Sequence, residues 1–114
     1  MHSILELNSM PLDTETKNEI SRCVNEVLNT LGKEGKQILM NYLDAHMGLK
    51  EEEIPQKPEL FSKGLKLILG EQGANALETT IAQELQTSFK LLHNPKLTFT
   101  QAIDIIKERQ SKSC

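Results

Sequence analysis

The sequence predicts an all-α fold, a compact bundle of four to five short helices with no significant sheet. Apolar residues recur with the helical period of about 3.6 residues in several segments, whereas only residues 3–7 offer a short candidate strand. The chain has 114 residues, of which 38% are hydrophobic and 25% charged, as in an ordinary globular domain. We therefore expect an N-terminal segment at residues 1–12, one helical domain at 13–110 and a flexible tail at 111–114.

The first helix is expected to begin near Asp13 or Thr14, since either side chain is a good N-cap. Thr16 and Glu19 also have the spacing of a capping box. Gly32 is predicted to end this helix as a left-handed C-cap. The apolar stripe of the helix consists of Ile20, Val24, Val27, Leu28 and Leu31.

The second helix is expected at residues 33–48, where Gly48 ends it. Its predicted inward residues are Ile38, Leu39, Tyr42, Leu43 and Met47. Pro55 and Pro58 then exclude a continuous helix through residues 49–59. Pro58 suits the first turn of the third helix, where a missing N–H costs nothing. We interpret the acidic run at 51–53 as a solvated connector, in preference to an acidic docking patch.

The third and fourth helices are expected at residues 58–69 and 75–94, separated by the turn from Gly70 to Gly73. In a single straight helix their apolar stripes would point in nearly opposite directions, and two internal glycines would cost roughly 2 kcal/mol. We expect Gly70 to be a C-cap, with Asn75 and Glu78 as the next N-cap and its partner. The two predicted stripes are Phe61, Leu65, Ile68 and Leu69, then Leu77, Ile81, Leu85, Phe89 and Leu92.

The fifth helix is expected after Asn94-Pro95, which stops the fourth. Thr98 and Gln101 have the spacing of a capping box at its start. Its predicted inward stripe is Phe99, Ala102, Ile103 and Ile106.

No residue is predicted to be catalytic, to bind a cofactor or to bind a metal. His2, His46 and His93 share no zinc-ligand spacing, and Cys23 is expected to be a small buried or boundary residue. With Cys114 at the last position, the two cysteines do not form a disulfide framework.

Nucleic-acid binding is disfavoured by the net charge of −3 and by the 4% aromatic content. The G-x-x-G at 70–73 holds Glu and Gln where a phosphate-binding loop needs positive charge, so a turn is the preferred interpretation. A basic surface is possible if the second and third helices are neighbours, from Lys33, Lys36, Lys63 and Lys66. The alternative of a helix-turn-helix regulator would use Gln83, Gln86 and Lys90 of the fourth helix.

The segment from Leu31 to Leu85 resembles the small archaeal helical domain called the Nitrosopumilus output domain. The resemblance covers about half of the chain and lies in the order of several short elements. These elements are Leu31-Gly32, Gly48-Leu49, Glu53-Ile54-Pro55, Pro58-Glu59-Leu60-Phe61, and Leu69-Gly70 through Gly73-Ala74. The resemblance implies a signalling output or interaction module and supplies no catalytic residues.

Together these patterns predict a non-enzymatic domain that acts through protein–protein contact, with a second copy of the chain as its partner. Dense apolar stripes in a small chain favour a homodimer, which would cover them. No apolar run approaches the ~20 residues of a membrane span, and the N-terminus lacks a signal-peptide pattern. We therefore expect a cytoplasmic protein that needs no cofactor, membrane or small molecule.

Overall fold

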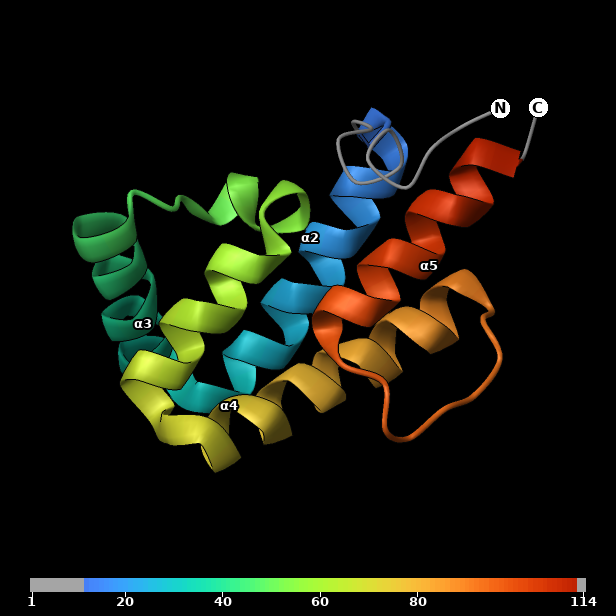
Figure 1. Cartoon of the computed structure of the whole chain (residues 1–114). Helices are drawn as coiled ribbons and strands as arrows, with labels where there is room; N and C mark the ends of the chain where they lie inside the picture. The colour runs from blue at the N-terminus through green and yellow to red at the C-terminus, as the bar shows by residue number, and fades with distance from the viewer. Residues whose placement is uncertain (1–11, 113–114) are drawn as a thin grey trace.

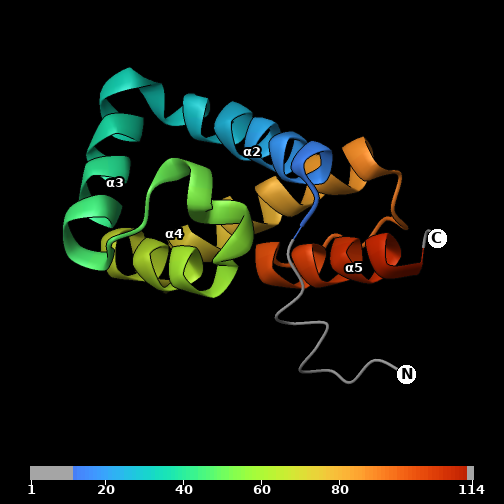
Figure 2. The same cartoon turned by 90° about the horizontal axis from the view of Figure 1, so that it is seen from above.

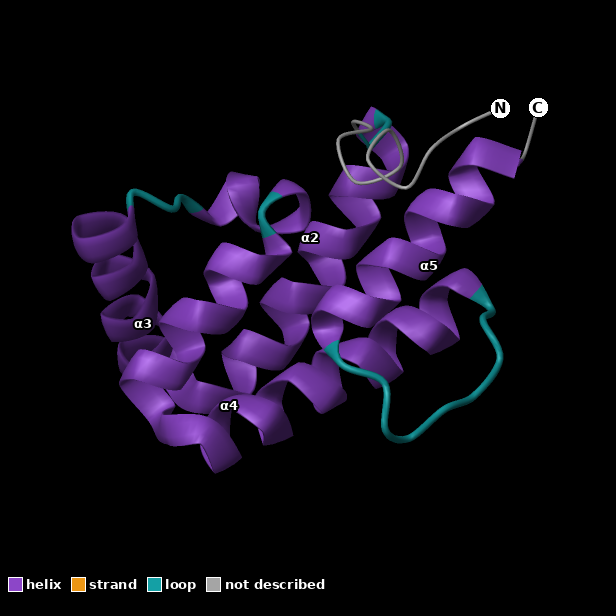
Figure 3. Cartoon of the chain, in the orientation of Figure 1, coloured by secondary structure: helices purple, strands orange, loops and turns teal. Residues whose placement is uncertain are grey.

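The computed structural model describes residues 12–112, with side chains through residue 110, as helices joined by loops (Figures 1 and 3). No strand occurs in that range, which confirms the predicted all-α class. The candidate strand at 3–7, His2 and Cys114 lie outside the described residues. The elements in chain order are α2 (Thr14–Leu28), η1 (Asn29–Leu31), α3 (Gly32–Met47), η2 (Glu51–Gln56), α4 (Pro58–Phe89) and α5 (Phe99–Lys112).

The helices form two layers joined by a bent α4. A break at Gly70 divides α4 into a first limb, residues 58–69, and a second limb, residues 71–89. The first limb lies in one layer together with α5, and α2 lies in the other layer (Figure 2). The second limb of α4 crosses below α2 and α5 in the view of Figure 1, and α4 contacts both helices. The α3 helix closes one end of the bundle. This arrangement makes α4 the central element, since it contacts α2, α3 and α5.

Aliphatic side chains fill the space between the layers, with two phenylalanines at its centre. Phe61 on α4 and Phe99 at the start of α5 are fully buried and meet edge to face, with ring centroids 5.4 Å apart. Burial of the aliphatic and aromatic side chains of this core supplies the main driving force for folding. The other large side chains that are fully buried are Ile20, Val24, Leu28, Leu43, Leu49, Ile54, Leu65, Ile81, Leu85 and Ile103.

A close helix crossing joins α3 to the first limb of α4 at Gly64. A Cβ atom at this position would lie 2.2 Å from Leu43 Cδ2 and 2.9 Å from Met47 Sδ. Gly64 therefore brings the two helices together where any larger side chain would separate them.

The first helix begins at Asp13, whose carboxylate accepts a 2.8 Å hydrogen bond from Thr16 N–H. The predicted Thr16–Glu19 capping box is wrong, because Thr16 already lies inside the helix. The prediction for Gly32 is correct in the sign of φ, which is 85°, but its ψ of 162° lies outside the left-handed helical region. The α-helix ends earlier, at Leu28, and η1 fills the interval as a tighter turn.

The turns on either side of residues 51–56 agree with the sequence. Gly48 ends α3 in the left-handed conformation, and Pro58 occupies the first turn of α4. Between them the predicted connector folds into η2, which buries Ile54 and Pro55 against the core. The acidic run makes local contacts: Glu53 accepts a hydrogen bond from the Lys50 N–H and pairs with Lys57.

The predicted turn from Gly70 to Gly73 reduces to a break at one residue. Gly70 has φ 78° and ψ 172°, and helical geometry resumes directly after it. Gly73 is not part of the break, and Asn75 is not an N-cap, because both lie within the second limb. A single residue suffices because glycine accepts this backbone conformation without a Cβ clash.

Several predicted core residues are exposed to solvent. Leu92 is 94% exposed, because α4 ends at Phe89 with Lys90 in the left-handed conformation instead of continuing to Asn94. Ile38 is 66% exposed. Leu31 and Leu69 are each 39% exposed. The inward residues Tyr42, Met47, Ile68, Leu77 and Phe89 are only partly buried.

The final helix matches its prediction most closely. Thr98 and Gln101 form the expected capping box, with Gln101 Oε1 accepting from Thr98 N–H at 3.0 Å. Gln101 N–H in turn donates to Thr98 Oγ1 at 3.4 Å. The predicted stripe from Phe99 to Ile106 is buried, and the helix runs to Lys112, two residues beyond the predicted domain boundary.

Candidate functional site

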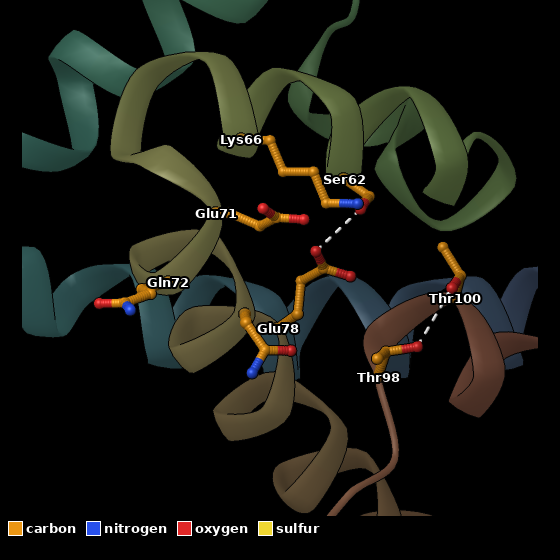
Figure 4. Close-up of a pocket in the computed structure, with 8 residues that line it drawn as sticks. Ser62, Lys66, Glu71, Gln72, Glu78, Thr98 and Thr100 are labelled. Atoms are coloured by element: carbon orange, nitrogen blue, oxygen red, sulfur yellow. Dashed lines mark hydrogen bonds between the residues drawn. The ribbon is translucent and has the colours of Figure 1, made fainter.

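A polar pocket of about 440 Å³ lies in the bend of α4 (Figure 4). Both limbs of α4 and the beginning of α5 contribute to it, so the break at Gly70 creates the concave surface. Every lining side chain carries a hydrogen-bonding group. The lining residues are Ser62, Lys66, Glu71, Gln72, Asn75, Glu78, Thr98 and Thr100.

Glu78 is the buried acid of this pocket, with 4% of its surface exposed. Its Oε2 atom accepts a 2.8 Å hydrogen bond from Ser62 Oγ on the other limb. Its Oε1 atom accepts no hydrogen bond. Every fully buried polar side-chain atom of the described residues has a hydrogen-bond partner, so Oε1, which has none, must be in contact with the solvent of the pocket.

The remaining polar groups surround this carboxylate. Glu71 and Lys66 point into the pocket from either side of the bend, and Thr98 and Thr100 bound it at the start of α5, 3.2 Å apart through their hydroxyl oxygens (Figure 4). Among the described residues, no salt bridge within 4 Å joins Lys66 to Glu71 or Glu78. With two carboxylates and one ammonium group, the lining has a formal charge of −1.

An apolar groove of about 350 Å³ occupies the opposite face of the second limb of α4. At 100° per residue, the groove residues of this limb point about 160° away from the pocket residues. Leu31 and Leu69 form its exposed walls, while Gly73 and Ala76 leave space between them. None of its lining side chains is charged: they are Val27, Thr30, Leu31, Leu69, Gly73, Ala76, Leu77 and Thr80.

The histidines and Cys23 do not converge on a site. No group of three or more metal-ligating side chains occurs in the part of the chain that the structure describes. His46 is exposed and packs on Tyr42, with ring centroids 4.4 Å apart. Cys23 is buried as expected, and burial raises the pKa of its thiol, which opposes formation of the nucleophilic thiolate.

The residues considered for nucleic-acid contact are dispersed. Gln86 is buried, and its amide group exchanges hydrogen bonds of 3.0 and 2.7 Å with the backbone of Asn94. Of the three residues of the helix-turn-helix alternative, Gln83 is exposed on α4 and Lys90 is exposed directly after the end of α4. Of the four lysines of the possible basic surface, Lys36 bonds Asn25 and pairs with Glu51, while Lys66 faces the pocket.

The sequence predicts the bend but not the pocket. The predicted turn and helix cap contain Glu71, Gln72, Asn75 and Glu78, which together form one polar face of the second limb. Successive members of this set are one, three and three positions apart, and residues three or four positions apart are neighbours on a helix surface. This spacing is the sequence signal that indicates the polar face. Ser62 and Thr98 join it only through tertiary packing.

No protein-family model, curated protein or solved structure matches the chain. The resemblance of residues 31–85 to the Nitrosopumilus output domain therefore stays a prediction. Within residues 12–112, no helix has both the length and the apolar character that crossing a membrane requires.

Proposed function

We propose that this protein is a non-enzymatic helical module that acts through protein–protein contact, and that its partner is a second copy of the same chain. The observation that carries the proposal is the uncharged apolar groove between the end of α2 and the second limb of α4. Exposed apolar concavities of this kind are typical of interaction surfaces.

A second copy suits the groove because the surface offers both a cavity and residues that could fill one. Leu31 and Leu69 project at its edges, while the small residues Gly73 and Ala76 leave room beside them. In a two-fold arrangement, the leucines of each copy would enter the space left by the small residues of the other. Self-association would thereby remove the exposed leucines of both copies from water.

The resemblance of residues 31–85 adds a biological role to this proposal. An output module transmits the state of a linked sensor by changing its contacts. The groove lies within the resembling segment apart from Val27 and Thr30, so a dimer formed there would be the contact that is regulated.

Sedimentation equilibrium on the full chain and two matched variants tests the proposal. Ala76 and Ala45 are both exposed alanines within helices, but only Ala76 lines the groove. Because a charge in the groove would be buried unpaired on association, we expect Ala76→Glu to weaken the dimer at least ~10-fold. Ala45→Glu should leave the dimer unchanged.

Two results would contradict the proposal. A wild-type chain that sediments as a strict monomer at the highest attainable concentration has no such dimer. Equal weakening by Ala76→Glu and Ala45→Glu would place the interface elsewhere. Circular dichroism spectra of both variants should match the wild type, because both positions face solvent.

A further inference from the structure

The polar pocket in the bend of α4 has the features of a ligand site that the proposed self-association does not use. It is formed by both limbs of one helix, holds a buried carboxylate and is open on one side. We propose that this pocket binds a small ligand that carries a primary ammonium group, held by Glu78 and Glu71.

Glu78 provides the central acceptor. A carboxylate has about four lone-pair sites, and Ser62 occupies one of them through Oε2. The Oε1 atom faces the pocket without a partner. A primary ammonium group brings three N–H donors, so it can bond this oxygen and still reach neighbouring acceptors.

The charge of the site favours a cation over an anion. Glu71 adds a second carboxylate at the pocket, and the lining has a formal charge of −1. A carboxylate held in so little water is stabilised most by an opposite charge that also donates hydrogen bonds. One ligand ammonium group would offset this formal charge.

Lys66 allows a second kind of ligand, one that carries a carboxylate in addition to the primary ammonium group. Its side chain points into the same pocket, and it forms no salt bridge with Glu71 or Glu78 among the described residues (Figure 4). A ligand carboxylate could pair with it while the ligand ammonium group pairs with Glu78. The site therefore suits either a simple amine or an α-amino acid, and 440 Å³ accommodates both.

Titration of the ¹⁵N-labelled full chain, followed by backbone amide shifts, tests the site. The probes are 1,4-diaminobutane, L-serine and butane-1,4-diol, the last matching the diamine in length without its charge. We expect saturable shifts for at least one ammonium probe, confined to residues near 62–78 and 98–100. The diol should produce none.

Two carboxamide variants with one control assign the binding to the pocket. We expect Glu78→Gln to weaken binding at least ~10-fold, since the ion pair is lost at nearly constant shape. Glu71→Gln, at an exposed position, should weaken it by a smaller factor and preserves the test if Glu78→Gln fails to fold. Glu84→Gln, on the same helix outside the pocket, should bind like the wild type.

Lys66→Met distinguishes the two ligand sources. A loss of serine binding with retained diamine binding identifies an amino-acid site, whereas no effect on either identifies a simple amine site. The proposal is overturned if neither ammonium probe gives saturable shifts. It is also overturned if the carboxamide variants bind as tightly as Glu84→Gln, or if the diol binds as well as the diamine.

Discussion

Ser62 Oγ donates a 2.8 Å hydrogen bond to Glu78 across the bend of α4. The two residues are sixteen positions apart and lie on different limbs, so this bond closes the angle that Gly70 opens. It also gives a hydrogen-bond donor to a carboxylate whose residue is only 4% exposed. The hydrogen bond therefore supports both the shape of the helix and the polar pocket within it.

Ser62→Ala should destabilise the protein by about 1–3 kcal/mol, because it leaves the buried Glu78 carboxylate without its hydroxyl donor. The measurement is urea unfolding followed by circular dichroism. Ser21→Ala is the matched control, since Ser21 is also a partly buried serine within a helix and makes no side-chain hydrogen bond among the described residues. If both substitutions change the free energy of unfolding equally, the bond to Glu78 contributes nothing specific.

Gly70→Ala should destabilise the protein by about 1–3 kcal/mol through backbone strain alone. The φ of 78° and ψ of 172° belong to a region that is accessible essentially only to glycine. A Cβ atom there would meet nothing within 4 Å, so steric overlap with neighbours does not contribute. Thermal or urea unfolding measures the loss.

Gly73→Ala is the comparison for this substitution, because Gly73 lies in the same stretch with helical geometry. Its added Cβ would lie 3.1 Å from Leu69 Cβ, a tight contact that opposes the gain in helix propensity of about 1 kcal/mol. We expect a net change well below that of Gly70→Ala. A larger loss at Gly73 than at Gly70 would show that the break is not where the backbone angles place it.

Glu19 should make the stability of the protein fall in acid. A hydrogen bond with Arg22 is the main cause, and one with Ser88 the second, of the lowering of the pKa of Glu19 to about 2 from an ordinary value near 4.5. The folded state therefore binds this proton less tightly than the unfolded state does. The contribution of the Glu19 carboxylate to the free energy of unfolding is fully present above about pH 4.5 and is lost as the pH falls toward 2. Since the carboxylate is one-third exposed, solvent reduces the effect.

Glu19→Gln isolates this contribution in urea unfolding measured between pH 2 and 7. The wild type should be more stable than the variant at neutral pH, and the difference should shrink below about pH 4.5. Glu52→Gln serves as the control, because Glu52 is exposed and joins no salt bridge among the described residues. A difference between wild type and Glu19→Gln that is constant with pH would show that Glu19 makes no ionic contribution.

The agreement between sequence and structure differs sharply between α5 and α4. In α5, the capping box and the buried stripe from Phe99 to Ile106 agree with prediction, because both depend on residues within one turn or one face. In α4, the apolar pattern predicted two helices but not where the second begins. The backbone at Gly70 required only one residue to change direction, and periodicity cannot resolve so short a break.

Errors in predicted burial have a common physical origin. Leu92 and Ile38 are apolar residues at helical spacing, yet 94% and 66% of their surfaces are exposed. Periodicity indicates which residues share a face but not how far a neighbouring element covers it. Leu92 lies beyond the end of α4. Ile38 lies about 140–180° around α3 from Leu43 and Met47, the side chains that meet α4 at Gly64.

The sequence by itself determined the all-α class, the helix-ending role of Gly48, the first-turn position of Pro58 and a change of helix direction at Gly70. Each depends on local backbone preferences or on the period of one segment. Only the tertiary structure decided that Glu78 is a buried acid instead of a capping residue. Its neighbours Ser62 and Thr98 come from distant segments, and packing of the two limbs against α5 brings them into one pocket.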